Sequence, residues 1–135
     1  MDLIEKKYFT IAEAEKLLPQ ITEILTKLMA ISRTLAAFNQ IKISFADDFG
    51  AYAYEITRNK NFHKLNHELF DGMEQLLEMG VLAKDLNTGL IDFYSMSGGR
   101  EIFLCWKIGE SHIGYWHELN TGFSGRKNIS QLAEV

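Results

Sequence analysis

Residues 81–107 read VLAKDLNTGLIDFYSMSGGREIFLCWK, three short apolar runs separated by two glycine-containing turns. Runs of this length, rich in β-branched and aromatic residues and bounded by Gly, Asn and Ser, are typical of strands in hairpins. Asn87-Thr88-Gly89 and Ser97-Gly98-Gly99 can supply the positive φ angles that tight hairpin turns need. The segment therefore predicts antiparallel strands at 81–86, 90–94 and 101–107.

A fourth run follows at 113–119, after the turn residues Gly109 and Glu110. Because side chains alternate along a strand, it would place His117 with Ile113, Tyr115 and Leu119 on one face and Trp116 with Gly114 and Glu118 on the other. We therefore expect a three- to four-stranded antiparallel meander over 81–127. Residues 128–135 are expected to form a tail without assigned structure.

The chain before Gly80 follows helical periodicity instead. Thr10 and Glu13 fit a capping box that starts a helix, and the apolar positions alternate steps of three and four as a stripe facing a core requires. That stripe contains Ile11, Ala14, Leu18, Ile21, Leu25 and Leu28. Pro19 lies inside it and removes one backbone N–H donor. We expect a helix that is kinked near Pro19 and continues to about Asn39.

A second helix is predicted after the loop residues 47–50, whose aspartates can cap it. Its apolar row is Phe62, Leu65, Leu69, Met73 and Leu76, and Gly80 stands where a left-handed residue would end it. Two long helices joined by a short loop run antiparallel. The sequence thus predicts one α+β domain over 1–135, with a helical hairpin (1–80) packed on the sheet.

The composition indicates the cellular compartment of the protein. The chain has 47% hydrophobic and 24% charged residues, close to soluble globular averages, and no apolar run approaches the roughly 18 residues of a membrane span. Its first residues mix charges where a signal peptide needs an apolar stretch. Cys105 is the single cysteine, so no intrachain disulfide can form. We expect a cytoplasmic protein without a membrane partner.

The charge balance bears on nucleic-acid binding. There are 14 basic and 18 acidic residues, a net charge of −4. That sign is opposite to the one that favours contact with phosphate backbones. Nucleic acid is therefore not an expected partner.

No familiar cofactor or catalytic motif is found, and no cofactor is expected. The sequence lacks a Gly-x-Gly-x-x-Gly fingerprint, a P-loop, a Gly-x-Ser-x-Gly elbow and a Cys-x-x-Cys pair. His63 and His67 have the i, i+4 spacing of metal ligands, with Glu74 as a third donor, but they lie on a polar helix face, and two surface histidines are the favoured explanation. Cys105 lies mid-strand, where a free cysteine is usually an inert buried residue.

Residues 99–126 concentrate the side chains that could bind a ligand. The candidates are Asp92, Arg100, Trp106, Glu110, Trp116, His117 and Arg126. His117 among large apolar neighbours, beside Asp92 or Glu110, fits general acid–base chemistry or a hydrogen-bonded core histidine. Arg100 and Arg126 each follow a glycine, and two such groups can grip a carboxylate or phosphate or brace loops through structural ion pairs. Both alternatives stay open.

A series of short motifs extends over nearly the whole chain: Tyr8-Phe9-Thr10, Glu13-Ala14, Leu17-Leu18-Pro19, Lys84-Asp85-Leu86, Gly89, Asp92-Phe93, Gly99-Arg100-Glu101, Leu104-Cys105-Trp106, Gly109-Glu110, Trp116-His117, Gly122-Phe123 and Gly125-Arg126. In these residues the chain resembles an uncharacterised prokaryotic family catalogued as domain of unknown function 2203. The resemblance implies a small cytoplasmic prokaryotic protein and brings no activity or catalytic residue. The helical half departs most from the family pattern, with Phe45, Phe49, Tyr52 and Tyr54 around the interhelical turn.

Two functions follow as hypotheses. The apolar faces of the hairpin are wider than one sheet needs, which favours a binding or assembly protein that forms a homodimer through the hairpin. Alternatively, the sheet half binds a small anionic ligand, as a binding protein or an enzyme. The residues leave open whether the protein is an enzyme.

Overall fold

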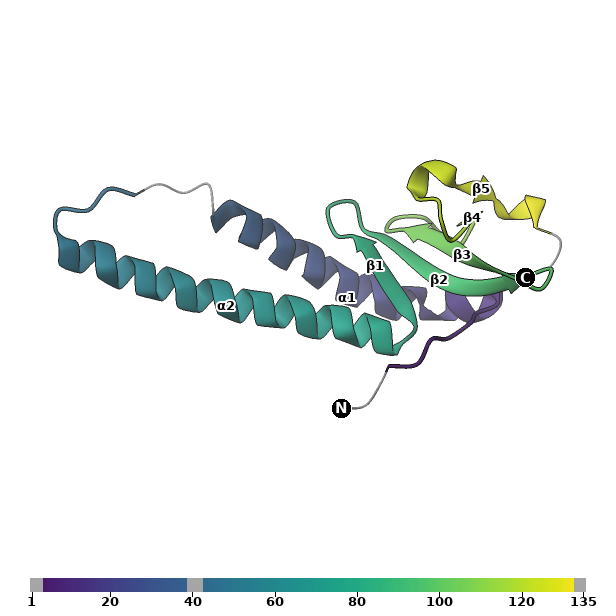
Figure 1. The fold of residues 1–135 in the computed structure, drawn as a ribbon, viewed down its shortest axis with the longest axis horizontal. Coiled ribbons are helices and arrows are strands. Elements are labelled where there is room, and N and C mark those ends of the chain that lie inside the picture. Colours follow the sequence, from purple (N-terminus) through teal and green to yellow (C-terminus); the bar gives the residue numbers. More distant parts are fainter. Residues whose placement is uncertain (1–3, 39–42, 133–135) are drawn as a thin grey trace.

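The computed structural model describes residues 4–38 and 43–132, which form two long helices followed by a five-stranded antiparallel sheet (Figure 1). The helices are α1 (Ile11–Phe38) and α2 (Asp48–Glu78); the strands are β1 (Val81–Asp85), β2 (Leu90–Ser97), β3 (Arg100–Lys107), β4 (Tyr115–His117) and β5 (Lys127–Asn128), with 3₁₀ turns at Phe123–Gly125 and Ile129–Gln131. The expected α+β fold of a helical hairpin on an antiparallel meander is confirmed.

The strands follow one another across the sheet in the order β1-β2-β3-β4-β5. β2 and β3 pair along their full length, from Leu90 opposite Lys107 to Ser97 opposite Arg100. Gly89, Gly98 and Gly99 adopt the positive φ angles that the turn sequences predicted. β1 pairs with β2 from Val81 opposite Phe93 to Asp85 opposite Leu90, with an irregularity between Ala83 and Asp85.

The last part of the sheet differs from the expectation in two ways. β4 is only three residues long, and Ile113 lies before it in the apolar core rather than beside His117 on the opposite face. The segment expected to be an unassigned tail contributes β5, in which Asn128 pairs with Tyr115, and a 3₁₀ turn; its residues 133–135 lie outside the described part. A two-residue strand has no periodicity of its own, so its pairing partner alone defines it.

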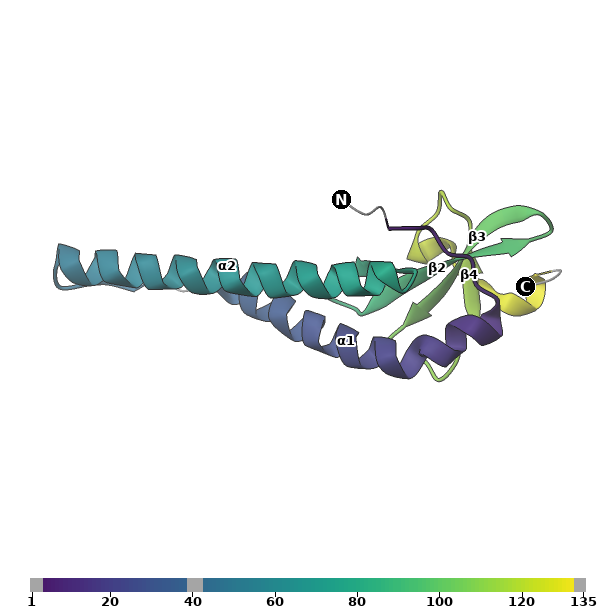
Figure 2. The ribbon, with the colours of Figure 1, turned by 90° about the horizontal axis from the view of Figure 1, so that it is seen from below.

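The helix boundaries follow the predicted signals. The Thr10 hydroxyl accepts from the Glu13 N–H, and the Glu13 carboxylate accepts from the Thr10 N–H. Asp47 caps α2 by accepting from the Gly50 N–H, and Gly80 (φ 91°) follows its end. α1 is continuous through Pro19, and Figure 2 shows its first, dark purple turns running in a different direction from the rest, as expected of a proline kink. The position expected for its last residue, Asn39, lies outside the described residues.

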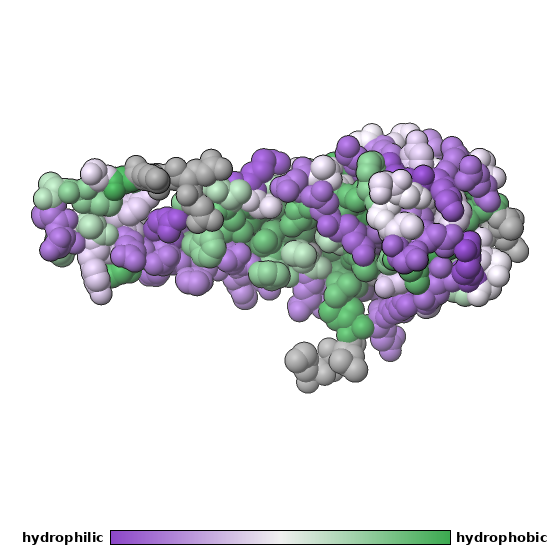
Figure 3. Space-filling model, turned by 45° about the horizontal axis from the view of Figure 1, so that its top comes forward, coloured by the Kyte–Doolittle hydropathy of each residue, from purple (hydrophilic) through white to green (hydrophobic). Residues whose placement is uncertain are grey.

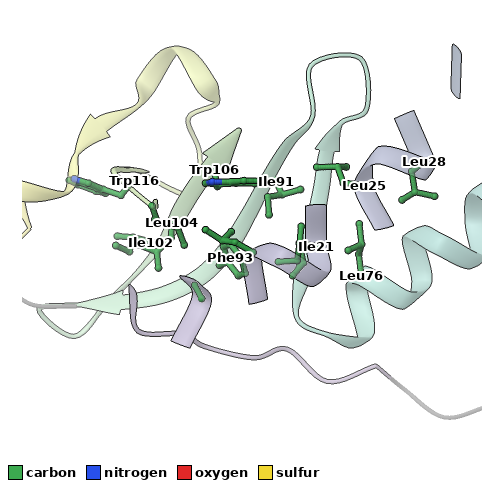
Figure 4. Close-up of a cluster of buried hydrophobic side chains, with 14 residues drawn as sticks. Ile21, Leu25, Leu28, Leu76, Ile91, Phe93, Ile102, Leu104, Trp106 and Trp116 are labelled. Carbon is green, nitrogen blue, oxygen red and sulfur yellow. The ribbon is translucent and has the colours of Figure 1, made fainter. Parts of the chain in front are cut away.

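The apolar core lies between one face of the sheet and the parts of both helices nearest to it (Figure 4). It contains Ala14, Leu18, Ile21, Leu25 and Leu28 of α1, Leu76 of α2, Val81, Ile91, Phe93, Ile102, Leu104, Trp106, Ile113 and Trp116. The buried positions of α1 thus end at Leu28, and α2 has one. All of the strong packing is at the sheet end of the molecule.

The hairpin extends well beyond this core (Figures 1 and 2). Among the described residues of 29–75, none is buried. The two helices are held there by an edge-to-face contact of Phe38 with Phe62 at 6.0 Å and by the Arg58 guanidinium, which donates to the Phe38 carbonyl at 2.6 Å. Neither helix is long and apolar enough over its described residues to cross a membrane.

Candidate functional site

The seven residues singled out in the sequence divide between the two faces of the sheet. Trp106 pairs with Ile91 and faces the helices, whereas Asp92 pairs with Cys105 and faces the other way. Trp116 is likewise on the core side, and His117 is on the side of Asp92. The structure therefore separates the two tryptophans from the Asp92–His117 pair, and it confirms the predicted placement of Trp116 and His117 on opposite faces.

Asp92 and His117 form a buried pair, each with a side chain 3% exposed. His117 Nε2 lies 3.1 and 3.0 Å from the two Asp92 carboxylate oxygens, and Nδ1 lies 2.7 Å from the Glu118 carbonyl oxygen. A carbonyl only accepts, so Nδ1 carries a proton. A second proton lies between Nε2 and Asp92, whichever of them holds it. The pair therefore has no net charge, which suits its burial.

Cys105 lies beside this pair, and the ligand atoms of Asp92, Cys105 and His117 are all within 4.8 Å of one another. Burial, followed by the negative charge of Asp92, raises the pKa of the Cys105 thiol to about 12. Metal binding requires a thiolate and a free imidazole nitrogen, but His117 Nε2 is bound to Asp92. The geometry fits an inert thiol beside a structural hydrogen bond, in line with the expectation for this cysteine.

Arg126 ties together four parts of the sheet half. Its Nη2 donates to Glu110 at 2.6 Å and to the Cys105 carbonyl at 3.4 Å, and its guanidinium lies 4.0 Å from the centre of the Tyr115 ring and 4.8 Å from that of Phe123. Burial lowers its pKa, but the hydrogen bond to Glu110 and the nearby charges outweigh burial and raise it overall. Arg126 thus acts as a brace between loops, one of the two roles that the sequence left open.

Arg100 and the two tryptophans also have partners within the protein. Arg100 donates to both carboxylate oxygens of Glu118, at 3.0 and 3.1 Å. The indole N–H of Trp106 donates to the Glu110 carbonyl at 3.0 Å, and Lys127 Nζ lies 4.8 Å from the centre of the Trp116 ring. A ligand at Arg100 or Trp106 would therefore have to displace existing bonds, whereas the buried indole N–H of Trp116 and the Nε of Arg126 have no hydrogen-bond partner among the described residues.

The weak metal candidates on α2 are dispersed in the structure. His67 Nε2 pairs with Asp71 at 3.3 Å, with both side chains largely exposed, and His63 packs edge-on against Phe62 at 5.8 Å. In the described part of the chain, the group of three close ligand atoms is the buried set around His117. It does not include His63, His67 or Glu74.

Three surface hollows stand out, and none is lined by the seven candidates. One of about 470 Å³ lies between the helices, where Ile24, Leu28 and Gly72 form part of its wall. Another of about 490 Å³ lies where α2 meets β1, with Phe70 and Leu77 among its lining residues. Both hollows belong to the helical hairpin or its junction with the sheet.

The three most exposed large apolar side chains among the described residues are also on α2. Phe49 is 83% exposed, Tyr52 69% and Phe70 63%, and Ile56 (49%) and Leu77 (42%) of the same helix are exposed as well. They lie away from the α1-facing row of Leu65, Leu69 and Leu76, and Figure 3 shows hydrophobic residues distributed along the hairpin surface. The sequence reading described this face by its histidines and acidic residues as polar. The spacing of Phe49, Ile56, Phe70 and Leu77 by seven, fourteen and seven residues is the signal that could have identified it.

Comparisons with known proteins give one result. A family model described as an uncharacterized conserved protein, DUF2203, matches residues 7–129. No curated protein and no solved structure matches the chain.

Proposed function

The chain belongs to the DUF2203 family of uncharacterized conserved proteins, and we propose that it is a cytoplasmic assembly module that self-associates through its helical hairpin. The family description names no activity, so the proposal rests on geometry. The observation that carries it is the long part of the hairpin, over the described residues of 29–75, in which no side chain is buried.

Helices are stabilised in water chiefly by burying an apolar face. Fully burying a Phe, Leu or Ile side chain stabilises a protein by about 1.5–3 kcal/mol. In the single chain, Phe49, Tyr52 and Phe70 remain mostly exposed to water. A partner that covers them therefore supplies stability that the isolated hairpin lacks, and a second copy of the chain is the partner we propose.

The small-ligand alternative has less support from the geometry. Asp92 and His117 are buried and bound to each other, and Arg100 and Arg126 are paired with Glu118 and Glu110. An anionic ligand would have to compete with these internal carboxylates. The hairpin, in contrast, presents apolar groups that have no competing partner to displace.

Light scattering on variants tests the proposal. Replacing Phe49 and Tyr52 together by Ser is expected to lower the average molar mass toward that of one chain, because each lost apolar side chain weakens the contact by about 1–3 kcal/mol. Met96, a 42%-exposed residue of β2, supplies the control: Met96→Ser is expected to leave the mass unchanged. Wild-type protein that stays monomeric at high micromolar concentration would contradict the proposal.

A further inference from the structure

The exposed apolar stripe of α2 has a regular spacing. Phe49, Ile56, His63, Phe70 and Leu77 follow one another at intervals of seven. Residues seven apart drift by only about 20° around a helix, so these five form a stripe that is about 42 Å long and turns by about 80° around α2. The stripe lies on average about 140° around α2 from the α1-facing row. It is therefore a second contact face, distinct from the one that closes the hairpin.

This stripe matches itself when reversed about its central residue. In an antiparallel pair centred on His63, Phe49 of one copy faces Leu77 of the other, Ile56 faces Phe70, and His63 faces its own counterpart. A surface that binds its own copy about a two-fold axis must be complementary to itself in this sense. Apolar residues meet apolar residues at every position except the axis.

The hollow between α2 and β1 favours the antiparallel orientation over the parallel one. It has a volume of about 490 Å³ and is lined by Phe70, Met73, Leu77 and Leu82, among others. It lies at the C-terminal end of α2, where the helix is followed by β1, whereas Phe49 lies in the first turn of the helix. Only an antiparallel partner brings Phe49 and Tyr52 of the second copy to this hollow. A parallel pair leaves the hollow empty and the tip aromatics against each other.

From these features we infer that the protein forms an antiparallel homodimer along α2, with its two-fold axis at His63 and the Phe49–Tyr52 tip of each hairpin in the α2–β1 hollow of the other. The inference rests on the proposed self-association and specifies its partner and register.

Disulfide trapping tests the register of the two helices. The native Cys105 is buried and is not expected to form a crosslink. Three single variants, Phe49→Cys, His63→Cys and Leu77→Cys, are oxidised separately and as a mixture of the first with the third. The inference predicts that His63→Cys crosslinks with itself, that neither of the others does so alone, and that the mixture crosslinks. The Cα atoms in such disulfides must approach to roughly 4.4–6.8 Å, so other registers do not give this pattern.

The outcomes separate the two proposals. Self-crosslinking of Phe49→Cys and of Leu77→Cys, with light scattering still reporting a dimer, overturns the antiparallel register and leaves self-association standing. Monomeric wild-type protein overturns both. Circular dichroism of each variant checks that it is folded.

Discussion

Asp92 and His117 show what burial demands of individual polar residues. Their two side chains and the Glu118 carbonyl satisfy one another, and the shared proton count keeps the group neutral. Removing one member would leave the other buried without its partner, which costs far more than the pair itself contributes. At the scale of single residues, the candidate residues of the sheet half maintain the fold.

Asp92→Ala is expected to destabilise the protein by about 3–5 kcal/mol, because removing one member of a buried ion pair leaves the other without its partner and costs about that much. Asp92→Asn is expected to cost less, because its amide can donate to a neutral His117 Nε2 while Nδ1 still donates to Glu118. Chemical denaturation measures both, with exposed Asp71→Ala as the control. A cost for Asp92→Ala no larger than that of Asp71→Ala would show that the pair is not structural.

The thiol of Cys105 gives a second test at the residue scale. Because its pKa is raised to about 12, the reactive thiolate is scarce near pH 8, and the group is also buried. Folded protein is therefore expected to resist alkylation by iodoacetamide, whereas protein in denaturant reacts fully. Rapid labelling of the folded form, measured by mass spectrometry, would contradict this description of the site.

Much of the residue-scale picture could be anticipated. The pairing of His117 with a carboxylate and the bracing role of the arginines were among the predicted alternatives. The choice between alternatives could not be made from the chain, because it depends on distances between β2, β4 and the loop at Glu110. The proximity of Cys105 to the pair was not anticipated, since it arises from strand register.

At the scale of elements, caps and turns are the features that local sequence predicts well. The capping box at Thr10, the Asp47 cap and the positive-φ glycines act within a few residues and need no distant partner. β5 depends instead on β4, and the short β4 depends on β3. β5, which its pairing with β4 alone defines, was therefore not predicted from the sequence, whereas the apolar run at 113–119 predicted β4 but neither its short length nor the exclusion of Ile113.

The junction of α2 with β1 provides the test at this scale. Gly80 has a φ of 91°, and a Cβ there would lie 2.7 Å from Phe9 Cε2. Gly80→Ala is therefore expected to destabilise the protein by about 1–3 kcal/mol. Gly122 has a φ of −105° and open space around it, so Gly122→Ala is expected to change stability by less than about 0.5 kcal/mol. Equal effects in thermal denaturation would contradict the strain argument.

Over the whole molecule, packing is divided unevenly. The sheet and the adjoining turns of the helices contain the core, while the rest of the hairpin projects with its apolar side chains exposed. The breadth of these apolar faces already favoured self-association in the sequence. The length of the hairpin that extends beyond the core could not be predicted from the sequence, because periodicity indicates which face of a helix is apolar and not which element covers that face.

Sedimentation equilibrium of the wild-type protein near pH 7.5 tests the central claim most directly. The account predicts a concentration-dependent molar mass that rises to twice the 15.5 kDa of one chain. A mass that stays at 15.5 kDa up to high micromolar concentration would contradict it.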